Sequence, residues 1–572
     1  VFETNGPSTP FLHLEDGRSY QIEGFTGGSL SLKDHPLTDV RVGRWDDNLA
    51  FPGDREAIEN KGSNVMVSYK NGNRDYFQAG SDSTPPRWFS LVARRDRFGN
   101  TIYFTMMQYG GMRIVDTWGR NITLDLFGGD GDKQHLRWNL HGGKTIEYLR
   151  HTNDGLKDLA IAEVRNQIYD PDTHPATFYE YYNPHLCVST GAFGSGAAGT
   201  MDYKTRLLKK ITYPTGAVTE YKYAYNLEED STPEPVKFYF KYKDGEPPDR
   251  GYRHNFLLRF RHDKWHAGEQ NRHNAKEYTY VQNDRQVFIA SAKVVTPYDG
   301  TTVEEHTFND EGQLLNKKVL QANRLIAQTN YTYGTEKTAA NYKLITSEVV
   351  TEYDRYAQQN QWAKTTLWTY SEGSQGKTAD ITRIEEQYSD DEMNQTTEME
   401  YHGPYNLLVR KRYKKDKNTT IFEQSNLHND IVVGNTEVYE ITNEGQVKKG
   451  RTQYAFGDAA NPYRPTLEQR YFKDNEASHH DILYEFNNGY CTQAPTKVTI
   501  PRIRDAAGNA LPDIVEYLRY DNEGYGRVVE KTDGNGNSTQ FEYDGLGRVV
   551  REFYPGTGHE KTIRYDDKAN VI

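Results

Sequence analysis

Four histidines between positions 254 and 273 are the first residues whose spacing could do chemistry. His262 and His266 are four positions apart, so on a helix they would share a face and could bind zinc. The residues just before them, 256–261, have the pattern of a strand, and Asp263 would point away from a shared face. A third ligand is also lacking. The sequence therefore favours solvated or loop histidines and predicts no metal site.

Acidic runs are the next candidates. Asp130-Gly131-Asp132 and the run from Asp533 to Asn537 could suggest calcium, but neither supplies the six or more oxygens that this ion requires. Both runs lie where a hairpin turn is expected. Asp390-Asp391-Glu392 could serve a glycosidase, yet chance pairs are frequent among 81 acidic residues. Turns and a solvated loop are the favoured interpretations.

A glycine-rich segment at 187–204 contains Gly194-x-Gly196-x-x-Gly199, the spacing of dinucleotide-binding loops. That motif needs a strand before it and a helix after it, whereas the chain here soon returns to a strand pattern. We expect a flexible loop. Cys187 and Cys491 have no zinc or nucleophile signature, and no Gly-x-Ser-x-Gly motif occurs. The sequence thus predicts no catalytic residue and no cofactor.

The elements that would position any site are clearest at the end of the chain, where 515–572 contains one unit three times. The copies centre on Tyr520-Asp521, Tyr543-Asp544 and Tyr565-Asp566, so the tyrosines are 23 and 22 positions apart. The residues before each tyrosine alternate as a strand does. Asp begins a turn and Gly closes it before Arg-Val-Val starts the returning strand. Each unit is therefore predicted to be a β-hairpin that must stack on its neighbours.

Weaker versions of this pattern occur earlier. Asp96-x-x-Gly-Asn, Asp116-x-x-Gly-Arg and the strand–turn–strand segment 207–223 are examples, and 309–313 and 442–446 are degenerate turns. Predicted strands also end in pairs of large apolar or aromatic residues that are separated by one residue: Tyr278/Tyr280, Tyr331/Tyr333, Trp368/Tyr370, Met399/Tyr401, Tyr454/Phe456 and Tyr484/Phe486. We expect a surface loop at 228–250 and at most a short helix at 358–364.

Composition narrows the function classes. A net charge of -12 with both signs scattered argues against a nucleic-acid surface, which requires a basic stripe. Forty-three tyrosines indicate half-buried sheet surfaces rather than disorder. No apolar run approaches the length of a membrane span, and no signal peptide is visible. Val1 is not an initiator and Ile572 lies inside a repeat, so we interpret the chain as a piece of a longer protein.

The run from Tyr543 to Arg548 resembles the YD repeat of the RHS proteins, which include bacterial polymorphic toxins, the Tc toxin B and C components and the teneurins. The resemblance is specific over about 515–572 and weaker over 90–125 and 205–225. It implies hairpins wound into a spiralling sheet that closes into a hollow shell, which in toxin members holds a C-terminal toxic domain. Those members end the shell core with an aspartate-based self-cleavage motif, Asp-Pro followed by Gly. This chain lacks the motif, so no self-cleavage is predicted.

The repeat residues are interpreted as structural. We expect Tyr543 and Tyr565 to stack across adjacent strands, and Arg527 and Arg548 to pair with turn aspartates of neighbouring units. The full set of repeat residues is Tyr520, Asp521, Gly526, Arg527, Tyr543, Asp544, Gly547, Arg548, Tyr565 and Asp566.

The repeated hairpins predict an all-β chain, and the resemblance implies a spiralling antiparallel sheet of hairpins that forms a hollow shell or part of one. Its expected divisions are a β-rich start at 1–186, the loop at 187–204, a degenerate repeat array with loop insertions at 205–514 and regular repeats at 515–572. The expected function is non-catalytic encapsulation of a C-terminal toxin or effector domain, in a secreted or cell-surface protein, by a wall whose polar interior would disfavour collapse of that domain.

Expected partners are that domain or a second shell-forming chain, with a delivery or secretion component, and neither nucleic acid nor a membrane span. Two alternatives stay open. One is an adhesion module that binds carbohydrate or protein through exposed tyrosines. The other is a polysaccharide-active enzyme on a β-scaffold.

Overall fold

The computed structural model shows an almost entirely antiparallel β-protein. Its described strands form one 39-stranded sheet and one four-stranded sheet. A single 3-10 turn at Asp391–Met393 is the only helical element in the described part of the chain, where no helix is long and apolar enough to cross a membrane. The structure describes residues 2–4, 10–13, 19–26, 29–32, 40–44, 65–79, 88–107, 111–116, 120–127, 135–140, 145–150, 161–166, 176–182, 185–192, 198–205, 207–224, 233–239, 252–283, 289–296, 302–310, 312–354, 360–371, 379–402, 405–459, 462–472, 479–487, 494–501, 507, 509–521, 526–544, 548–556 and 558–565.

The first eight strands pair in a ring. Each pairs with the next, and β1 pairs back onto β8 through Phe2 opposite Phe89 and Glu3 opposite Trp88. The same edge of β8 also pairs with β9 through residues 93–95, so the sheet branches there. The ring strands are β1 (Phe2–Thr4), β2 (Pro10–His13), β3 (Ser19–Thr26), β4 (Ser29–Leu32), β5 (Val40–Arg44), β6 (Val65–Tyr69), β7 (Arg74–Ala79) and β8 (Trp88–Arg95).

From β9 onward the sheet forms a long wall, in which each strand pairs with the next. The first part contains β9 (Thr101–Met106), β10 (Met112–Asp116), β11 (Asn121–Phe127), β12 (His135–Asn139), β13 (Thr145–Arg150), β14 (Ile161–Asn166), β15 (Ala176–Tyr181), β18 (Leu208–Thr212), β19 (Val218–Lys222), β22 (Phe260–Lys264), β23 (His273–Gln282), β24 (Ile289–Thr296) and β25 (Thr302–Phe308). The middle part contains β26 (Leu314–Gln321), β27 (Arg324–Tyr333), β28 (Ile345–Tyr353), β29 (Asn360–Tyr370), β30 (Ile381–Tyr388), β31 (Gln395–His402), β32 (Leu407–Lys414), β33 (Thr420–His428), β34 (Val432–Thr442), β35 (Gly445–Ala455), β36 (Leu467–Phe472), β37 (His479–Glu485) and β38 (Lys497–Ile500).

The regular repeats complete the described wall with β39 (Ile514–Tyr520), β40 (Val528–Thr532), β41 (Ser538–Tyr543), β42 (Val549–Phe553) and β43 (Glu560–Thr562). Strands β39 and β41 end at the repeat tyrosines, and the returning strands start at the valines after Arg527 and Arg548. The all-β prediction and its hairpin units are confirmed.

The four-stranded sheet interrupts the wall in two places. Its order is β17 (Ala198–Thr205), β16 (His185–Ala192), β21 (Tyr252–Phe256) and β20 (Pro235–Tyr239). The wall continues across both excursions, because β15 pairs with β18 and β19 pairs with β22.

This second sheet corrects two expectations. Segment 187–204, expected as a loop, forms most of the β16–β17 hairpin, with residues 193–197 outside the described part. Strand β20 lies inside 228–250, where only surface loop was expected. In the wall, residues 360–364 of the segment considered for a short helix belong to β29. The sequence did not predict these strands, because small and charged residues weaken the alternation of apolar residues in all three segments.

The wall is a single layer. Along β26, β27, β28 and β34, residues on both faces are almost all half-buried, as expected when neighbouring side chains cover one another but no second layer covers the sheet. The whole chain exposes 33849 Å². A compact monomer of 65.9 kDa would expose about 21000 Å².

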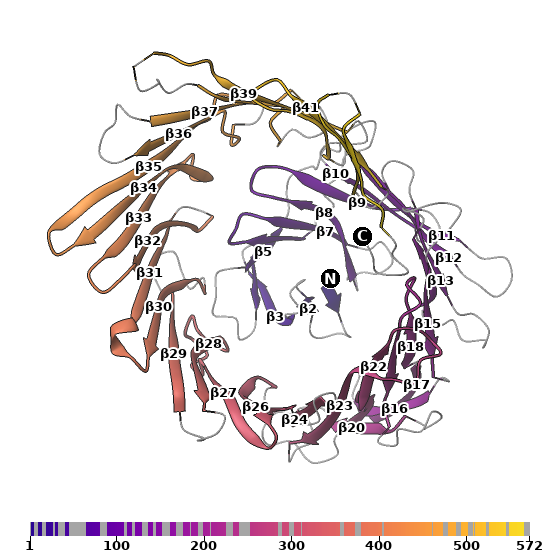
Figure 1. The fold of residues 1–572 in the computed structure, drawn as a ribbon. Coiled ribbons are helices and arrows are strands. Elements are labelled where there is room, and N and C mark those ends of the chain that lie inside the picture. The colour runs from indigo at the N-terminus through magenta and orange to yellow at the C-terminus, as the bar shows by residue number, and fades with distance from the viewer. Residues whose placement is uncertain are drawn as a thin grey trace.

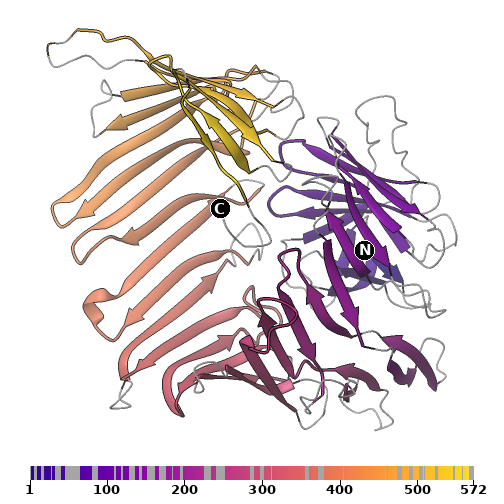
Figure 2. The ribbon, with the colours of Figure 1, turned by 45° about the vertical axis from the view of Figure 1, so that its right-hand side comes forward.

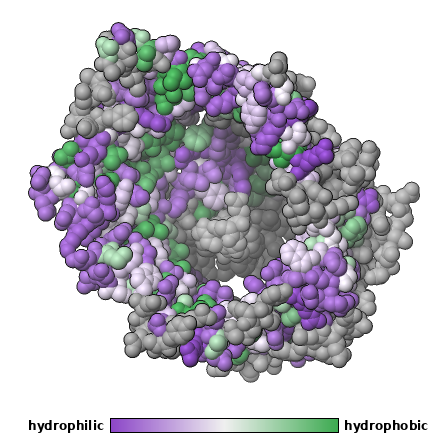
Figure 3. All heavy atoms as spheres, in the orientation of Figure 1, coloured by the Kyte–Doolittle hydropathy of each residue, from purple (hydrophilic) through white to green (hydrophobic). Residues whose placement is uncertain are grey.

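The wall curves around a central space that the eight-stranded ring partly fills (Figure 1). The turned view shows the wall strands lying side by side (Figure 2). Figure 3 shows the molecule hollowed at its centre, with both hydrophobic and hydrophilic residues visible along the inner wall. The inner surface is therefore mixed rather than only polar. The eight-stranded ring lies inside the circuit of the wall (Figure 1).

Tight burial is concentrated near the ring and the start of the wall. Tyr76, Val92, Ala93 and Tyr103 form a buried cluster in which β7, β8 and β9 meet. Further buried side chains, among them Val218, Phe260 and His262, lie on β19 and β22.

Candidate functional site

A five-residue turn recurs at the tips of the wall hairpins. In the turn from Asp544 to Arg548, the Asp544 N–H donates to the Arg548 carbonyl at 2.9 Å. The Asp544 carboxylate accepts from the Arg548 N–H at 3.0 Å and from its Nε at 2.7 Å. The same backbone bond closes turns that start at Tyr69, Asp96, Asp116, Tyr213, Asn309 and Asp533.

The fourth residue of this turn must adopt a positive φ. The described glycines at this position have φ between 81° and 92°, a region that a Cβ disfavours. They are Gly72, Gly99, Gly216, Gly312 and Gly536. The geometry is that of a three-residue hairpin loop, in which a left-handed residue leads back into the returning strand.

In several of these turns the first and fifth residues are polar partners whose identity varies. Arg120 Nε donates to Asp116 at 2.5 Å, and Asn100 Nδ2 donates to Asp96 at 2.8 Å. At 309–313 two amides replace the ion pair, with Asn309 Nδ2 donating to Gln313 Oε1 at 2.8 Å. The degenerate turn at 309–313 therefore keeps the geometry of the regular repeats, whereas at 442–446 Thr442 pairs directly with Gly445 across a two-residue turn.

The arginines pair within their own unit. Arg527 Nε lies 3.0 Å from the Asp521 carboxylate, and Arg548 Nη2 lies 2.7 Å from that of Asp544. Both ion pairs lie within one unit, where pairing with aspartates of neighbouring units was expected. The turn is short enough for the side chain after it to reach the carboxylate before it, which makes the nearer partner the favourable one.

The contact between units runs from arginine to tyrosine. The Arg527 guanidinium lies 5.4 Å from the centre of the Tyr543 ring, and that of Arg548 lies 4.0 Å from the Tyr565 ring. The ring contacts found at both tyrosines are thus with the arginine of the preceding unit, where stacking between tyrosines was expected. Each turn is linked to the next unit by a chain of Asp, Arg and Tyr. Gly547 and Asp566 lie outside the described residues.

The tyrosine hydroxyls add a second link. Tyr543 donates to the Val528 carbonyl at 2.6 Å and Tyr565 to the Val549 carbonyl at 3.0 Å, each acceptor being the first residue of the preceding strand. Tyr520 donates to the Pro495 carbonyl at 3.0 Å. The middle of the wall repeats the pattern with Tyr333 to Leu314, Tyr370 to Ile345 and Tyr401 to Ile381.

The same tyrosines mark β-bulges. The pairing register shifts by a residue at Tyr333, Tyr370, Tyr401, Tyr520 and Tyr543, in each case against the following strand. A bulge bends its strand and increases the local twist. The recurring bulges therefore supply a physical reason for the curvature of the wall.

Turns of the ring touch the wall more than 300 positions later in the chain. Lys70, in the turn between β6 and β7, lies 2.6 Å from the Asp380 carboxylate just before β30. Asn406, just before β32, donates to the same carboxylate. Asp380 is mostly buried, with 12% of its side chain exposed. These groups form the polar part of what we call the ring–wall contact.

Aromatic residues complete the ring–wall contact. Gly72 lies so close to the Tyr405 ring that any Cβ there would overlap it. The Phe98 ring, in the turn between β8 and β9, lies 6.0 Å from the ring of Tyr463 near β36. The eight-stranded ring of β1–β8 thus reaches the far side of the wall, between β30 and β36. No local motif marked these residues, because their partners are hundreds of positions away.

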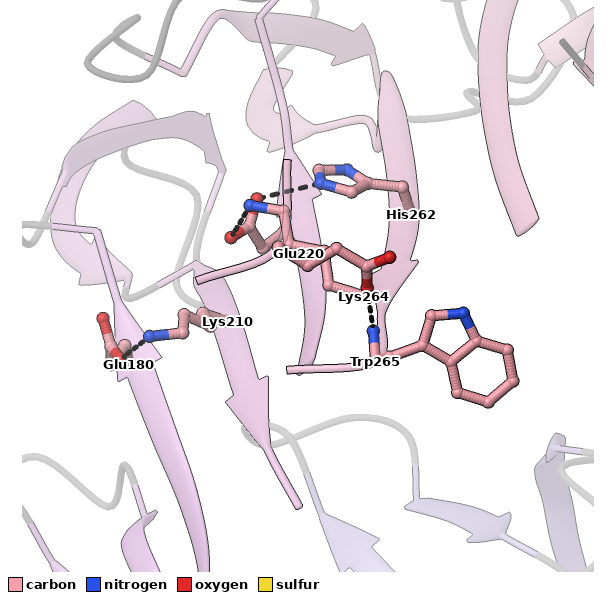
Figure 4. A network of polar contacts seen from close by, with 7 residues as sticks. Glu180, Lys210, Glu220, His262, Lys264 and Trp265 are labelled. Atoms are coloured by element: carbon pink, nitrogen blue, oxygen red, sulfur yellow. Dashed lines mark hydrogen bonds and ion pairs between the residues drawn. The ribbon is translucent and has the colours of Figure 1, made fainter. Parts of the chain in front are cut away.

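A second polar network holds the wall where the chain returns from the four-stranded sheet (Figure 4). Glu220 on β19 faces His262 on β22, with Oε2 and Nε2 3.0 Å apart, an ion-pair distance although the ring N–H is poorly aligned for a hydrogen bond. Lys264 Nζ lies 2.9 Å from the other Glu220 oxygen. The contact with the buried His262 side chain, which is 1% exposed, is the main cause that lowers the pKa of Glu220 to about 2, and Lys264 lowers it further. Nearby, Lys210 pairs with Glu180 at 2.6 Å (Figure 4).

The other candidate residues from the sequence lie in turns or make local contacts that stabilise turns. His266 lies in the turn after β22, and His273 pairs with Glu269 at 2.6 Å. No group of three or more potential metal ligands occurs among the described residues. Asp533 accepts three hydrogen bonds within its own turn. Asp390 is exposed and caps the 3-10 turn.

The remaining motifs fall partly outside the described residues. Asp130–Asp132 and Cys491 lie there entirely. Cys187 lies on β16, and Gly199 lies on β17 of an antiparallel hairpin. The βαβ unit that a dinucleotide site requires is therefore not formed by the strands around this glycine motif.

The family comparison falls on the two best-defined repeat units. The RHS repeat matches residues 520–558, which span both Asp–Arg turns and their tyrosines. This part of the chain consists of RHS repeats. The comparison with curated proteins finds no match.

Two solved structures are similar to this chain at low identity. The crystal structure of TcdB2-TccC3-TEV has a TM-score of 0.30 and 10% identity, with 96% of this chain and 28% of that chain covered. The Tc holotoxin pore of Photorhabdus luminescens, with a mutation in TccC3, has a TM-score of 0.29 and 11% identity, with 95% and 27% covered. This chain thus spans less than a third of the length of either.

Proposed function

We propose that this chain is an RHS-repeat protein throughout, that it is the wall section of a secreted bacterial toxin, and that the wall encloses a C-terminal toxin or effector domain until delivery. The observation that carries the proposal is the single-layer sheet curved around a hollow (Figures 1 and 3). A single-layer sheet buries little of its own surface, so its curvature does not serve to build a compact core. We infer that the curvature serves to enclose space. Its role would be structural rather than catalytic.

The strand edges support the same role. An open sheet exposes unpaired N–H and C=O groups that invite aggregation. Here each wall strand pairs on both sides up to β43, and β1 is paired with both β2 and β8. A second shell-forming chain, or further repeats, would be the natural partner for the edge at β43.

The ring–wall contact would close the enclosure at one end. The ring lies within the circuit of the wall (Figure 1), and its turns reach β30, β32 and β36 on the far side. A passenger placed in the hollow would meet this ring. Opening the contact would then expose the passenger.

Limited proteolysis of the whole gene product tests the proposal. We expect the C-terminal domain to resist protease as long as the wall is intact, and Asp380→Ala to accelerate its cleavage at least tenfold, because the variant removes the acceptor shared by Lys70 and Asn406. Asp390→Ala, at an exposed carboxylate on the neighbouring turn, is the matched control. Equal cleavage of the domain inside the native product and as a free domain would overturn the proposal.

Small-angle scattering provides a second, independent measurement on the chain itself. A compact chain of 572 residues would have a radius of gyration of about 25 Å. We expect a clearly larger value and a distance distribution with the depleted centre of a hollow particle. A value near the compact expectation would contradict an enclosing wall.

A further inference from the structure

A pocket of about 270 Å³ lies at one rim of the wall. It is formed where the β18–β19 turn meets the β22–β23 turn, and its lining includes Tyr213, Thr219, Arg261, Asp263, Trp265 and Asn274. The volume is close to the lower end of small-molecule sites and suits a single ring-sized ligand.

Two aromatic rings border this pocket and remain open to solvent. Trp265 is 65% exposed and Tyr213 is 38% exposed. Trp265 is nevertheless held in place, because its backbone N–H donates to Glu269 at 2.6 Å and its indole ring meets the His273 ring edge-on at 5.3 Å. An exposed but fixed indole offers a large apolar surface at low entropic cost to a ligand.

The pocket also contains an organised carboxylate. Asp263 accepts hydrogen bonds from Thr219 Oγ1 at 2.8 Å, from Asn274 Nδ2 at 3.1 Å and from Arg261 Nη2 at 3.4 Å. Asn274 has a φ of +49°, a conformation that few residues other than glycine and asparagine adopt readily. The turn therefore fixes a set of planar donors and acceptors beside the indole.

The charges around the pocket are balanced. Arg261 is paired with Asp263, Lys264 with Glu220 and His273 with Glu269. An anionic ligand such as a phosphate would have to compete with these carboxylates. A neutral ligand with several hydroxyl groups would instead use the same donors and acceptors without leaving a charge uncompensated.

We propose that this rim pocket binds a neutral sugar unit of a polysaccharide or glycan. The apolar C–H face of a pyranose would lie on Trp265, and its hydroxyls would hydrogen-bond with Asp263, Asn274 and Arg261. The site would add a recognition function to the wall that does not depend on what the wall encloses.

Binding of neutral oligosaccharides to the intact chain tests the site. Saturation-transfer NMR and calorimetry with glucose-, galactose-, mannose- and N-acetylglucosamine-terminated oligosaccharides should identify at least one ligand. Trp265→Ala and Asp263→Asn should each weaken its binding at least tenfold. Tyr517→Ala, which removes a 51% exposed aromatic ring elsewhere on the wall, should leave it unchanged.

Two further measurements keep the outcome decisive. Trp265→Tyr preserves an aromatic ring and should retain much of the affinity, which separates a lost platform from a misfolded turn. Bound sugar should also shield indole fluorescence from acrylamide in the native chain but not in Trp265→Ala. The proposal is overturned if none of these sugars binds, if binding ignores both pocket variants, or if inorganic phosphate binds the pocket more tightly.

Discussion

At the scale of single residues, the repeat depends on side chains that each make two contacts. Arg548 pairs with Asp544 through two nitrogens and lies over the Tyr565 ring. A lysine could supply the charge but neither the planar fork nor the stacking surface. These dual roles explain why the sequence showed Tyr, Asp, Gly and Arg together in the clearest units.

Arg548→Lys should therefore loosen the last hairpins although the charge is conserved. We expect a loss of about 1 kcal/mol in local stability, from a weaker ion pair and the lost ring contact. Hydrogen exchange at β41–β43 measures it, and should accelerate several-fold. Glu542→Gln, at a carboxylate that is 54% exposed, is the control. Unchanged exchange in Arg548→Lys would show that the arginine contacts carry no stability.

Glu220 predicts an acid-sensitive junction between β19 and β22. His262 and Lys264 lower its folded pKa to about 2 from an ordinary 4.5, so the ionised form stabilises the fold. That stability is present above pH 4.5 and is lost as the pH falls towards 2, and it amounts to about 2–3 kcal/mol at most. Urea unfolding at pH 7 and at pH 2.5 should show this loss in the native chain.

The control for this pH effect is Glu220→Gln, which cannot ionise. The variant should be less stable than the native chain at pH 7, and the difference between the two should shrink as the pH falls from 4.5 to 2. A constant difference across this range would mean that the carboxylate charge does not stabilise the junction.

At the scale of elements, the hairpin unit was predictable and its bulge was not. Asp and Gly at fixed spacing specify the turn, and alternating aromatics specify the strands. The register shift at Tyr370 and its equivalents depends on how the next strand packs, which a single strand does not reveal. The strands of 187–204 were missed for a related reason, since their pairing with each other and with β21 outweighs a composition of small residues.

Tyr370→Phe tests the hydroxyl at the bulge. The variant keeps the ring but leaves the Ile345 carbonyl without the donor that lies 2.6 Å away. We expect a loss of about 1 kcal/mol and faster hydrogen exchange where β28 and β29 meet. Tyr554→Phe, at a tyrosine that is 41% exposed and whose hydroxyl contacts Glu552, should have almost no effect. Equal effects of both substitutions would argue against a specific role for the bulge tyrosines.

At the scale of the whole molecule, each wall strand depends mainly on its two neighbours, as in other repeat proteins. The ring–wall contact is the exception, because it joins parts of the chain that are 310 positions apart. The continuous wall followed from recognising the repeats in the sequence. The pairing of Lys70 with Asp380 did not, since a chain with 69 cationic and 81 acidic side chains offers no local signal for one long-range pair.

Two turn glycines separate the local and global effects of one substitution. Gly216→Ala has open space around its Cβ, so it should cost only the strain of a positive φ, about 1 kcal/mol. Gly72→Ala has similar strain but also displaces the Tyr405 ring. We expect an enlarged radius of gyration only for Gly72→Ala. Identical scattering curves for the two variants would show that the ring–wall contact does not set the shape.

The branch at β8 makes the ring–wall contact depend on the number of strands in the wall. The eight-stranded ring and the wall both start from β8. The number of strands between β9 and β30 therefore determines which wall residue lies opposite Lys70. Adjacent strands lie about 4.8 Å apart, so deleting one hairpin between β9 and β30 would shorten the circumference by about 10 Å. Such a deletion would bring a different turn opposite Lys70. Changes in chain length along this arc are therefore tolerated in the turns but not in the number of strands.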